Sequence, residues 1–266
     1  MRTSTTKILD GKTALITGAS SGLGAEFARQ LARMGCHLIL VARRTERLQA
    51  LREELSRNPG VITTCLTFDL VGENAPQKLS DQLMAANQTV DVLINNAGYG
   101  LYGEFAETPW ASMHQMLELD MVVLTHLTRL FVPDMLKRNF GYILNVASTG
   151  AFQPTPTYAA YSAAKSYVLS LSQALHFELR KSAVKCTALC PGVTRTEFFS
   201  VAGQEMTAYQ RRTVMESADV ARIGLEAMLA GRPVVVAGWL NAFVAWATRF
   251  LPGQWLAGAS NRLMRN

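Results

Sequence analysis

Cysteine is scarce in this sequence, and its placement points neither to a disulfide framework nor to a metal site. Four cysteines occur among 266 residues, none in a Cys-x-x-Cys pair, and each falls in or beside an apolar, strand-like run. The four histidines are scattered without the spacing of metal ligands. We therefore expect reduced core thiols, as in an intracellular protein, and no metal site. The cysteines are Cys36, Cys65, Cys186 and Cys190.

Long hydrophobic runs are also missing. No stretch reaches the roughly 18 apolar residues of a membrane-spanning helix, and residues 1–7 lack the apolar core of a secretion signal. These absences predict a cytoplasmic protein that is not secreted. The net charge is +6, but the densest basic stretch, 43–57, also carries three glutamates and leucines at helical spacing. Because that pattern is typical of a solvated amphipathic helix, we expect no nucleic-acid partner.

What is present is an alternation of short apolar strands and amphipathic helices. Such alternation predicts a parallel sheet with helices on both faces. The chain is 49% hydrophobic and 17% charged, and its length suffices for one large core. We predict a single-domain, doubly wound α/β fold over residues 1–266, with about seven strands. The predicted strands are 12–17, 36–41, 61–68, 90–95, 142–148, 184–189 and 233–236, and the helices end near 34 and 57 and then span 74–86, 109–138, 158–182 and 217–230.

A glycine-rich turn follows the first predicted strand and precedes a helix. Glycines let the backbone approach a phosphate group, and the helix N-terminus offers free N–H groups and a partial positive charge. The spacing differs from Gly-x-Gly-x-x-Gly, yet the physical basis is the same. We therefore predict that this turn binds the phosphates of a dinucleotide. The predicted binding residues are Gly18, Ser20, Ser21, Gly22, Leu23 and Gly24.

Two arginines, Arg43 and Arg44, follow the second strand, where dinucleotide folds often place an acid that binds the adenosine ribose. A guanidinium group suits a 2′-phosphate instead and can stack on adenine. We therefore predict NADP(H) in preference to NAD(H), although the arginines could simply begin the next helix. After the third strand comes Asp69-Leu70. Asp69 could accept a hydrogen bond from the adenine amino group, or it could cap a turn.

Two more loops follow strands whose carboxyl ends meet at one edge of the predicted sheet, where ligands bind in this architecture. In the first, Asn95-Asn96-Ala97-Gly98, small residues would let a bound ribose lie close to the backbone. The second begins Pro191-Gly192-Val193. Ser148 ends the strand between them, although a lone serine there is usually a turn residue. The predicted cofactor contacts in these loops are Asn95, Ala97, Gly98, Pro191 and Gly192.

Tyr161 and Lys165 are four residues apart in the helix predicted over 158–182. That spacing places both side chains on one helix face, so their polar ends can point into one site. A free tyrosine has a pKa of about 10, and a nearby ammonium group lowers it. Such a phenol could exchange a proton near neutral pH, as general acid–base catalysis requires. Taken alone, a tyrosine and a lysine at this spacing are more often an ordinary helical pair.

The motifs together are more specific than any one of them. In order and spacing, the glycine turn, Asn-Asn-Ala-Gly, Ser148, Tyr161-x-x-x-Lys165 and Pro-Gly resemble the short-chain dehydrogenase/reductase family over about residues 11–236. The resemblance implies that Tyr161 donates or accepts a proton, while Lys165 lowers its pKa and holds the nicotinamide ribose. It implies that Ser148 orients the substrate carbonyl or hydroxyl. It also implies that Val193 and Thr196 contact the cofactor, as Tyr161 and Lys165 do.

One position departs from the family pattern. The family usually has an asparagine in the long helix before Ser148, where it anchors a water beside the lysine, and by spacing this position is Asp120. A carboxylate only accepts hydrogen bonds, and its charge would offset the effect of Lys165 and leave the tyrosine pKa higher. Our hypothesis is that Asp120 biases Tyr161 towards acting as an acid. The alternative is that Asp120 holds the same water with little kinetic effect.

The C-terminal extension, residues 237–266, is apolar and contains no acidic residue. Three of the four tryptophans lie here, with several arginines and with aromatic residues at helical spacing. Three interpretations remain open. The segment could be a helix packed on the substrate entrance or on a partner subunit, a helix lying in a membrane surface, or plain core packing. We favour the packed helix, with peripheral membrane contact as the second choice.

These observations lead to an expected function. We expect NADPH-dependent reduction of a hydrophobic carbonyl, such as a ketone, a steroid or a 3-oxoacyl thioester, with Tyr161 as general acid. The partly apolar segment 196–209 would serve as a lid. The alternatives are oxidation of an alcohol in the cell, or a sensor or scaffold that binds NADP(H) without turnover. The resemblance, to ketoreductases, 3-oxoacyl reductases and hydroxysteroid dehydrogenases, also implies a homodimer or homotetramer.

Overall fold

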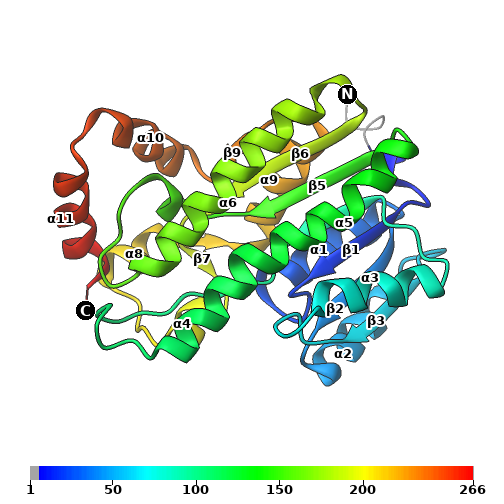
Figure 1. The fold of residues 1–266 in the computed structure, drawn as a ribbon, viewed down its shortest axis with the longest axis horizontal. Coiled ribbons are helices and arrows are strands. Elements are labelled where there is room, and N and C mark those ends of the chain that lie inside the picture. Colours follow the sequence, from blue (N-terminus) through cyan, green and yellow to red (C-terminus); the bar gives the residue numbers. More distant parts are fainter. Residues whose placement is uncertain (1–5, 266) are drawn as a thin grey trace.

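A seven-stranded parallel sheet forms the centre of the computed structural model, which describes residues 6–265. The predicted single doubly wound α/β architecture is confirmed (Figure 1). The order of the strands in the sheet is β3-β2-β1-β4-β5-β6-β9. The strands are β1 (Thr13–Thr17), β2 (His37–Ala42), β3 (Thr63–Thr67), β4 (Val92–Asn95), β5 (Gly141–Val146), β6 (Val184–Cys190) and β9 (Val234–Val236), and a two-stranded ladder joins β7 (Thr194–Arg195) to β8 (Met215–Glu216).

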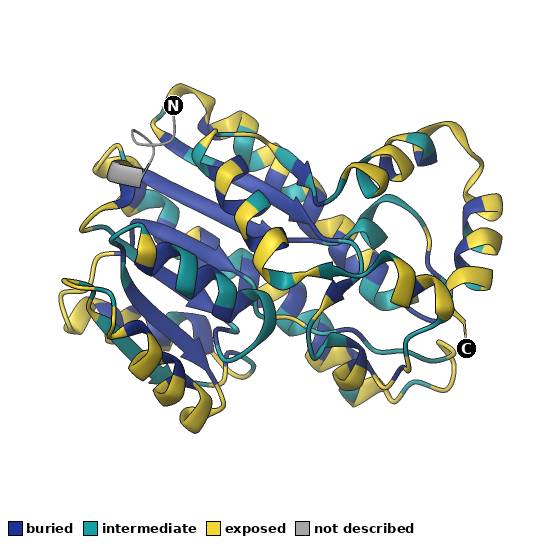
Figure 2. Ribbon diagram, turned by 180° about the vertical axis from the view of Figure 1, so that it is seen from behind, coloured by how far each residue is buried: buried dark blue, intermediate teal, exposed yellow. Residues whose placement is uncertain are grey.

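Helices cover both faces of this sheet because successive strand residues point to opposite sides. In β1, Ala14 and Ile16 pack with α1, α2 and α9, whereas Leu15 packs with α3 and α5 on the other face. Figure 2 shows the strands buried between helices whose outer sides are exposed. The helices are α1 (Gly22–Arg33), α2 (Thr45–Leu55), α3 (Ala75–Ala85), α4 (Trp110–Leu117), α5 (Leu124–Lys137), α6 (Ala159–Glu178), α7 (Phe198–Ala202), α8 (Ala208–Thr213), α9 (Ser217–Leu229), α10 (Trp239–Ala247) and α11 (Gly253–Met264).

The strand order places a crevice at one edge of the sheet. The chain runs outward from β1 to β3 and then returns to β4, which pairs with the other side of β1. Ile16 of β1 lies between Leu40 of β2 and Ile94 of β4 in the register. Because the loops after β1 and β4 diverge to opposite faces, their carboxyl ends leave room for a ligand. The glycine turn and the Asn-Asn-Ala-Gly loop are the two segments that leave these strands.

Two predicted boundaries were wrong in ways that affect the site. The helix predicted over 109–138 is interrupted: a π-helical stretch, Glu118–Val123, separates α4 from α5 and contains Asp120. Inserted π-helical turns occur frequently at functional sites. The strand predicted to reach Ser148 ends at Val146, because Ser148 is the N-cap of a 3₁₀ turn, Thr149–Phe152.

The C-terminal extension forms α10, a short 3₁₀ turn (Thr248–Phe250) and α11, at the left of Figure 1 beyond the carboxyl ends of the strands. No helix within residues 6–265 combines the length and apolar character that crossing a membrane requires. The same range contains no cluster of three or more metal-ligating side chains. All four cysteines are free thiols, and three of them are buried, which confirms their predicted place in the core.

Candidate active site

A cavity of about 810 Å³ lies over the carboxyl ends of the central strands. It brings together the glycine turn, the ends of β2, β4, β5 and β6, the start of α6, and the inner sides of α7, α10 and α11. Most of the predicted site residues line it. They are Gly18, Ser20, Ser21, Gly22, Leu23, Arg43, Arg44, Asp69, Leu70, Ala97, Gly98, Ser148, Tyr161, Lys165, Pro191, Gly192, Val193 and Thr196. Of the other predicted residues, Asp120 lies behind Lys165, and Gly24 and Asn95 pack elsewhere.

The glycine turn is tightly packed against the loop after β4. Gly18 has a φ of +66°, and a Cβ there would lie 2.9 Å from the Ala97 Cα atom. Gly22 has a φ of +53°, and its Cβ would lie 2.9 Å from the Thr196 methyl group. Gly24 does not line the cavity, contrary to its predicted role. A Cβ at Gly24 would overlap the Gly18 carbonyl oxygen, so this glycine lets α1 pack closely against the turn.

The two adjacent asparagines at the end of β4 differ in what they contact. Asn95, predicted as a cofactor ligand, is buried, and its Nδ2 donates to Thr128 Oγ1 and Asn145 Oδ1 at 2.9 Å each. It therefore joins β4 to α5 and β5. Asn96, which the prediction omitted, lines the cavity, and its Nδ2 donates to the carbonyl oxygens of Thr17 and Gly18. Asn96 is the residue that ties this loop to the glycine turn.

Arg44, which follows β2 and lines the cavity, makes three different contacts. Its guanidinium donates to the hydroxyls of Ser20 (3.0 Å) and Ser21 (2.7 Å) and pairs with the Glu197 carboxylate at 2.8 Å. Asp69 lines the cavity nearby, and its Oδ1 accepts a hydrogen bond from Val71 N at 3.0 Å. The turn-capping role considered for Asp69 is thus present.

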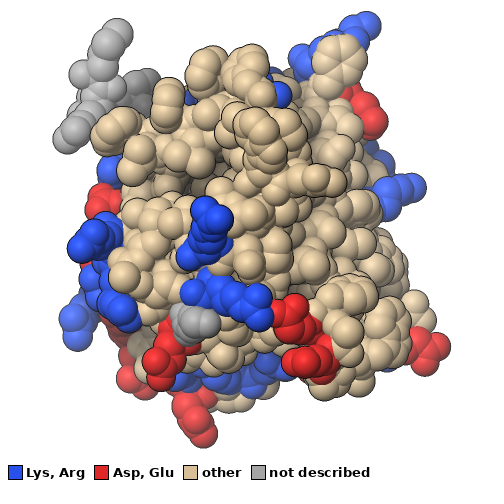
Figure 3. All heavy atoms as spheres, turned by 90° about the vertical axis from the view of Figure 1, so that its left-hand side faces the viewer, with Lys and Arg blue, Asp and Glu red and all other residues tan. Residues whose placement is uncertain are grey.

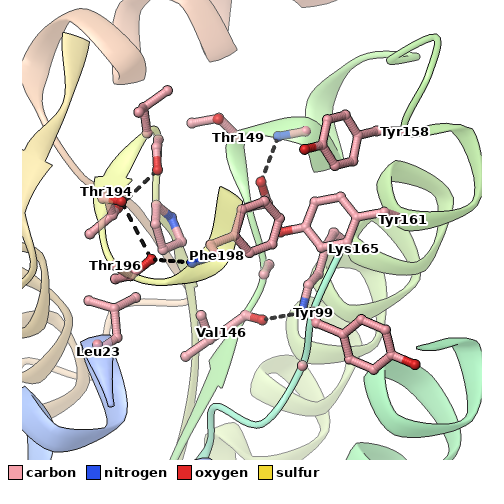
Figure 4. Close-up of a pocket in the computed structure, with 18 of the residues that line it drawn as sticks. Leu23, Tyr99, Val146, Thr149, Tyr158, Tyr161, Lys165, Thr194, Thr196 and Phe198 are labelled. Carbon is pink, nitrogen blue, oxygen red and sulfur yellow. Dashed lines mark hydrogen bonds between the residues drawn. The ribbon is translucent and has the colours of Figure 1, made fainter. Parts of the chain in front are cut away.

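Figure 4 shows how Tyr161 and Lys165 point from α6 into the cavity. Lys165 Nζ lies 5.6 Å from the centre of the Tyr161 ring and donates to the Val146 carbonyl oxygen at 3.1 Å. Ser148 Oγ accepts from Gly150 N at 3.1 Å, and the Ser148 side chain lies near enough to the Tyr161 hydroxyl to lower the pKa of that phenol. The structure therefore brings the three residues together, with the Ser148 and Tyr161 hydroxyls adjacent.

Asp120 forms a buried ion pair with Lys165. Its Oδ2 lies 3.0 Å from Lys165 Nζ, its Oδ1 accepts from Tyr99 N at 3.2 Å, and its side chain has no exposed surface. Gly98 leaves the space for this pair, because a Cβ there would lie 2.5 Å from Asp120 Oδ1 and 3.2 Å from Lys165 Nζ. The π-helical stretch holds Asp120 against α6, which places its charge behind the catalytic candidates.

The pKa of Tyr161 shifts in the direction opposite to the one expected from Lys165 alone. Burial raises the pKa of Tyr161 above its usual value, the Asp120 charge raises it further, and the hydrogen bond with Ser148 lowers it only in part. The prediction that Lys165 brings this pKa near neutrality was therefore wrong. Burial also raises the pKa of Asp120, against the opposing effect of Lys165. The Tyr161 phenol is consequently protonated throughout the neutral range.

Aromatic and aliphatic side chains close the rest of the cavity. The Phe198 ring of α7 lies 5.3 Å from the Tyr161 ring and stacks on Tyr158 at 6.3 Å. Tyr158, which was not predicted as a site residue, donates its hydroxyl hydrogen to Gln204 Oε1 at 2.9 Å. The C-terminal extension completes this apolar wall with Val244 of α10, Leu256 and Leu263 of α11, and Leu251 between the two helices. The C-terminal extension thus packs on the cavity, the first of the three interpretations considered for it.

Comparison with known proteins agrees with this geometry. Residues 12–207 match the family described as short chain dehydrogenase. The chain is 35% identical over 216 residues to sulfoacetaldehyde reductase 2 of Chromohalobacter salexigens, covering 79% of this chain and 85% of that one. It is 31% identical over 251 residues to a very-long-chain 3-oxoacyl-CoA reductase of Mycosarcoma maydis, covering 91% and 71% of the two chains.

A solved structure is also similar over most of its length. A short-chain dehydrogenase from Sphingobium yanoikuyae, in complex with NADPH, has a TM-score of 0.81 and 32% identity, covering 90% of this chain and 93% of that one. Another similar structure, a short chain dehydrogenase/reductase from Burkholderia phymatum with 27% identity and a TM-score of 0.80, covering 90% of this chain and 92% of that one, is in complex with NAD, so nicotinamide cofactors of both kinds occur among these neighbours. The match to the family extends from β1 to the segment after β6 and includes Ser148, Tyr161 and Lys165. The chain therefore belongs to the short-chain dehydrogenase/reductase family of oxidoreductases, which act on carbonyl and alcohol groups.

Proposed function

We propose that the protein is an NADPH-dependent reductase of an apolar carbonyl compound, with Tyr161 as its general acid. The observation that carries the proposal is the cavity over the strand ends, where Ser148, Tyr161 and Lys165 face an apolar wall that begins at Phe198. The raised pKa of Tyr161 agrees with it, because a phenol that stays protonated suits proton donation better than proton removal. The named relatives include reductases of an aldehyde and of a 3-oxoacyl-CoA. Arg43 and Arg44 at the cofactor end of the cavity support NADPH as the donor.

The residues present fit such a cofactor. The close approach at Gly18 and Gly22 leaves a backbone cradle that a side chain would fill, and Arg44 with Ser20 and Ser21 offers donors for a phosphate. Gly98 and Lys165 line the same part of the cavity, where a ribose would lie. When bound, the nicotinamide would supply the hydride. The protein would hold it in place and provide the proton.

The proton-donating step uses the two adjacent hydroxyls. Ser148 Oγ accepts from Gly150 N, which orients this hydroxyl, and its hydrogen would turn from Tyr161 to the carbonyl oxygen of a bound substrate. Tyr161 donates its phenolic proton to that same oxygen as the carbonyl carbon is reduced. Lys165, one turn away on α6, stabilises the phenolate that forms. The apolar wall from Phe198, α10 and α11 excludes water from this region and favours a hydrophobic group beside the carbonyl.

The test of this function is a substrate panel. Purified protein is mixed with NADPH or NADH and carbonyl compounds ranging from small polar aldehydes to steroids and 3-oxoacyl thioesters, and loss of nicotinamide absorbance is followed. We expect turnover with NADPH that increases with the apolar surface of the substrate. Binding of NADPH without turnover of any compound would instead support the alternative of a sensor or scaffold. Faster turnover with small polar aldehydes would contradict the proposed substrate class.

Asp120→Asn should move the pH profile of the reaction. Removing this negative charge lowers the pKa of Tyr161, since the Asp120 carboxylate raises it in the wild type. Carbonyl reduction needs the protonated phenol, so its decline at alkaline pH should begin at a lower pH in the variant. Alcohol oxidation needs the phenolate and should gain activity near neutral pH, by about tenfold for each unit of the pKa change. Identical pH–rate profiles for the two proteins would disprove the bias that we assign to Asp120.

The outer side of the C-terminal extension supports a second part of the proposal, contact with an anionic membrane surface. We define the C-terminal surface by its exposed aromatic residues, among which Trp239 and Trp255 are 82% and 71% exposed. Figure 3 looks onto this end of the molecule, where uncharged side chains form a broad area with basic side chains within it. Aromatic residues with arginines suit the interface of an anionic bilayer. The surface consists of Trp239, Phe243, Trp246, Phe250, Trp255, Arg249 and Arg262.

A second copy of the chain fits this surface less well. A twofold interface places a patch against its own copy, so Arg249 and Arg262 would face like charges with no acidic residue of the extension to offset them. We expect the protein to sediment with vesicles that contain anionic lipid and not with purely zwitterionic ones. Trp239→Ser with Trp255→Ser should weaken this binding by about tenfold or more. The control is Trp110→Ser, an equally exposed tryptophan on α4. Dimerisation that depends on the same two tryptophans, without vesicle binding, would establish the homo-oligomer instead.

A further inference from the structure

The Arg44 guanidinium is already engaged by an anion of the protein itself. Glu197 Oε2 lies 2.8 Å from Arg44 Nη1, and Glu197 Oε1 lies 2.5 Å from Nη1 of Arg47 on α2. The two arginines thus form a cluster of donors around one carboxylate, and Arg44 also donates to the Ser20 and Ser21 hydroxyls. Glu197 comes from the segment after β7, about 150 residues away in the sequence. Both Arg44 and Glu197 line the cavity, so this contact between distant segments lies at its wall.

We propose that Glu197 competes with the 2′-phosphate of NADP(H) for Arg44 and Arg47 and thereby sets the cofactor preference of the enzyme. The inference rests on the proposed use of NADPH. Carboxylate and phosphate groups present the same paired acceptor oxygens to a guanidinium group, and the donors of Arg44 cannot serve both fully. NADH has no 2′-phosphate, so its binding leaves the Glu197 contacts in place. Glu197 therefore weakens NADPH binding selectively.

Both ion pairs of Glu197 are weak enough for a bound phosphate group to replace the carboxylate. The side chains of Arg44, Arg47 and Glu197 are 42%, 48% and 40% exposed, so solvent screens both pairs. A 2′-phosphate carries more negative charge and one more oxygen than a carboxylate, so it can displace Glu197. The two arginines lower the pKa of Glu197 to about 2, and its carboxylate stays charged at any pH used for assay. Glu197 therefore competes with the 2′-phosphate throughout the neutral pH range, and the competition does not depend on titration of Glu197.

Glu197 also connects this donor cluster to the catalytic candidates. It directly precedes α7, whose first residue, Phe198, packs on the Tyr161 ring. The neighbouring Thr196 methyl group contacts the glycine turn at Gly22. The carboxylate therefore tethers the start of α7 to α2, across the mouth of the cofactor site. This explains why a residue of the substrate-side segment affects recognition of the adenosine end of the cofactor.

The test compares dissociation constants for NADPH and NADH, measured by quenching of protein fluorescence or by calorimetry without substrate. Glu197→Gln keeps the shape and removes the charge. We expect its Kd for NADPH to fall by about threefold to tenfold, as for loss of an exposed competing ion pair, and its Kd for NADH to change by less than about twofold. Glu216→Gln is the matched control, because Glu216 forms a similar exposed pair with Arg195 at 2.7 Å, away from the donor cluster.

A second set of variants tests whether the effect of Glu197 depends on the two arginines. In Arg44→Gln/Arg47→Gln protein, the additional Glu197→Gln change should leave both dissociation constants unaltered, because the groups for which Glu197 competes are gone. An equal effect of Glu197→Gln on both cofactors, or an effect that persists in that background, would overturn the inference. A wild-type protein that binds NADH as tightly as NADPH, with no loss in the arginine variants, would show instead that the proposed cofactor preference is wrong.

Discussion

Tyr161→Phe is expected to reduce the kcat of carbonyl reduction by about 10²–10⁴-fold, the range that a positioned general acid contributes. The phenyl ring remains, so the packing against Phe198 at 5.3 Å is preserved and only the hydroxyl is lost. Ser148 alone can still polarise the carbonyl oxygen, but it has no comparable route to supply a proton. The affinity for NADPH should remain within about twofold, because the hydroxyl contributes to the chemical step more than to binding.

The matched control for this substitution is Tyr167→Phe. Tyr167 lies on the same helix, and its hydroxyl interacts with Thr125 Oγ1 at 2.9 Å, outside the cavity. It should keep wild-type kcat, and both variants should unfold at temperatures close to that of the wild type. Single-turnover measurements with saturating NADPH would confirm that the chemical step is affected in Tyr161→Phe. Retention of more than about a tenth of the wild-type rate would rule out Tyr161 as the general acid.

Residue order was sufficient to predict the sheet and most of the cavity lining. Strands such as Thr13–Thr17 and Val184–Cys190 are mostly buried and rich in apolar residues because both faces of the sheet are covered, and this makes them easy to recognise. Each loop with a predicted role follows one of these strands. Parallel pairing brings the carboxyl ends of the strands together, so the loops meet without further information.

The errors in the predicted site arise where the direction of a side chain depends on an exact element boundary. Asn95 is the last residue of β4 and bonds to α5 and β5, whereas Asn96 begins the loop and bonds to the glycine turn. A change of one position in the strand boundary exchanges their roles, and sequence patterns do not fix boundaries to one residue. The π-helical stretch around Asp120 is similar. It inserts a residue into a continuous helical pattern, and nothing in the spacing of apolar residues in 109–138 marks it.

The pKa of Tyr161 was mispredicted for a different reason. Spacing along α6 correctly placed Lys165 one turn from Tyr161, but a pKa depends on burial and on every charge nearby. The Lys165 ammonium contacts Asp120 and the Val146 carbonyl oxygen, and the Asp120 carboxylate raises the pKa of Tyr161 against the effect expected from the lysine. Asp120 was identified as the departure from the family pattern. Its effect on Tyr161 has the direction that was predicted, while burial makes the larger contribution.

Lys165→Met should lower both activity and stability, and a second substitution should separate the two effects. The Asp120 side chain has no exposed surface, and Lys165 is its counter-ion at 3.0 Å. Removing one partner of such a buried pair leaves an uncompensated charge, which costs about 3–5 kcal/mol in the free energy of unfolding. Lys137→Met is the control, because its pair with Asp134 is exposed and should contribute about 0.5 kcal/mol or less.

Asp120→Asn in the Lys165→Met background removes the stranded charge while preserving the hydrogen bond from Tyr99 N. We expect the double variant to recover most of the free energy of unfolding measured in urea, because a neutral amide costs far less to bury than a carboxylate. Its kcat should stay as low as that of Lys165→Met, because no cation remains to stabilise the Tyr161 phenolate. Recovery of activity together with stability would mean that Lys165 acts only by balancing Asp120. Failure to recover either would place the defect in the packing of α6 against the π-helical stretch.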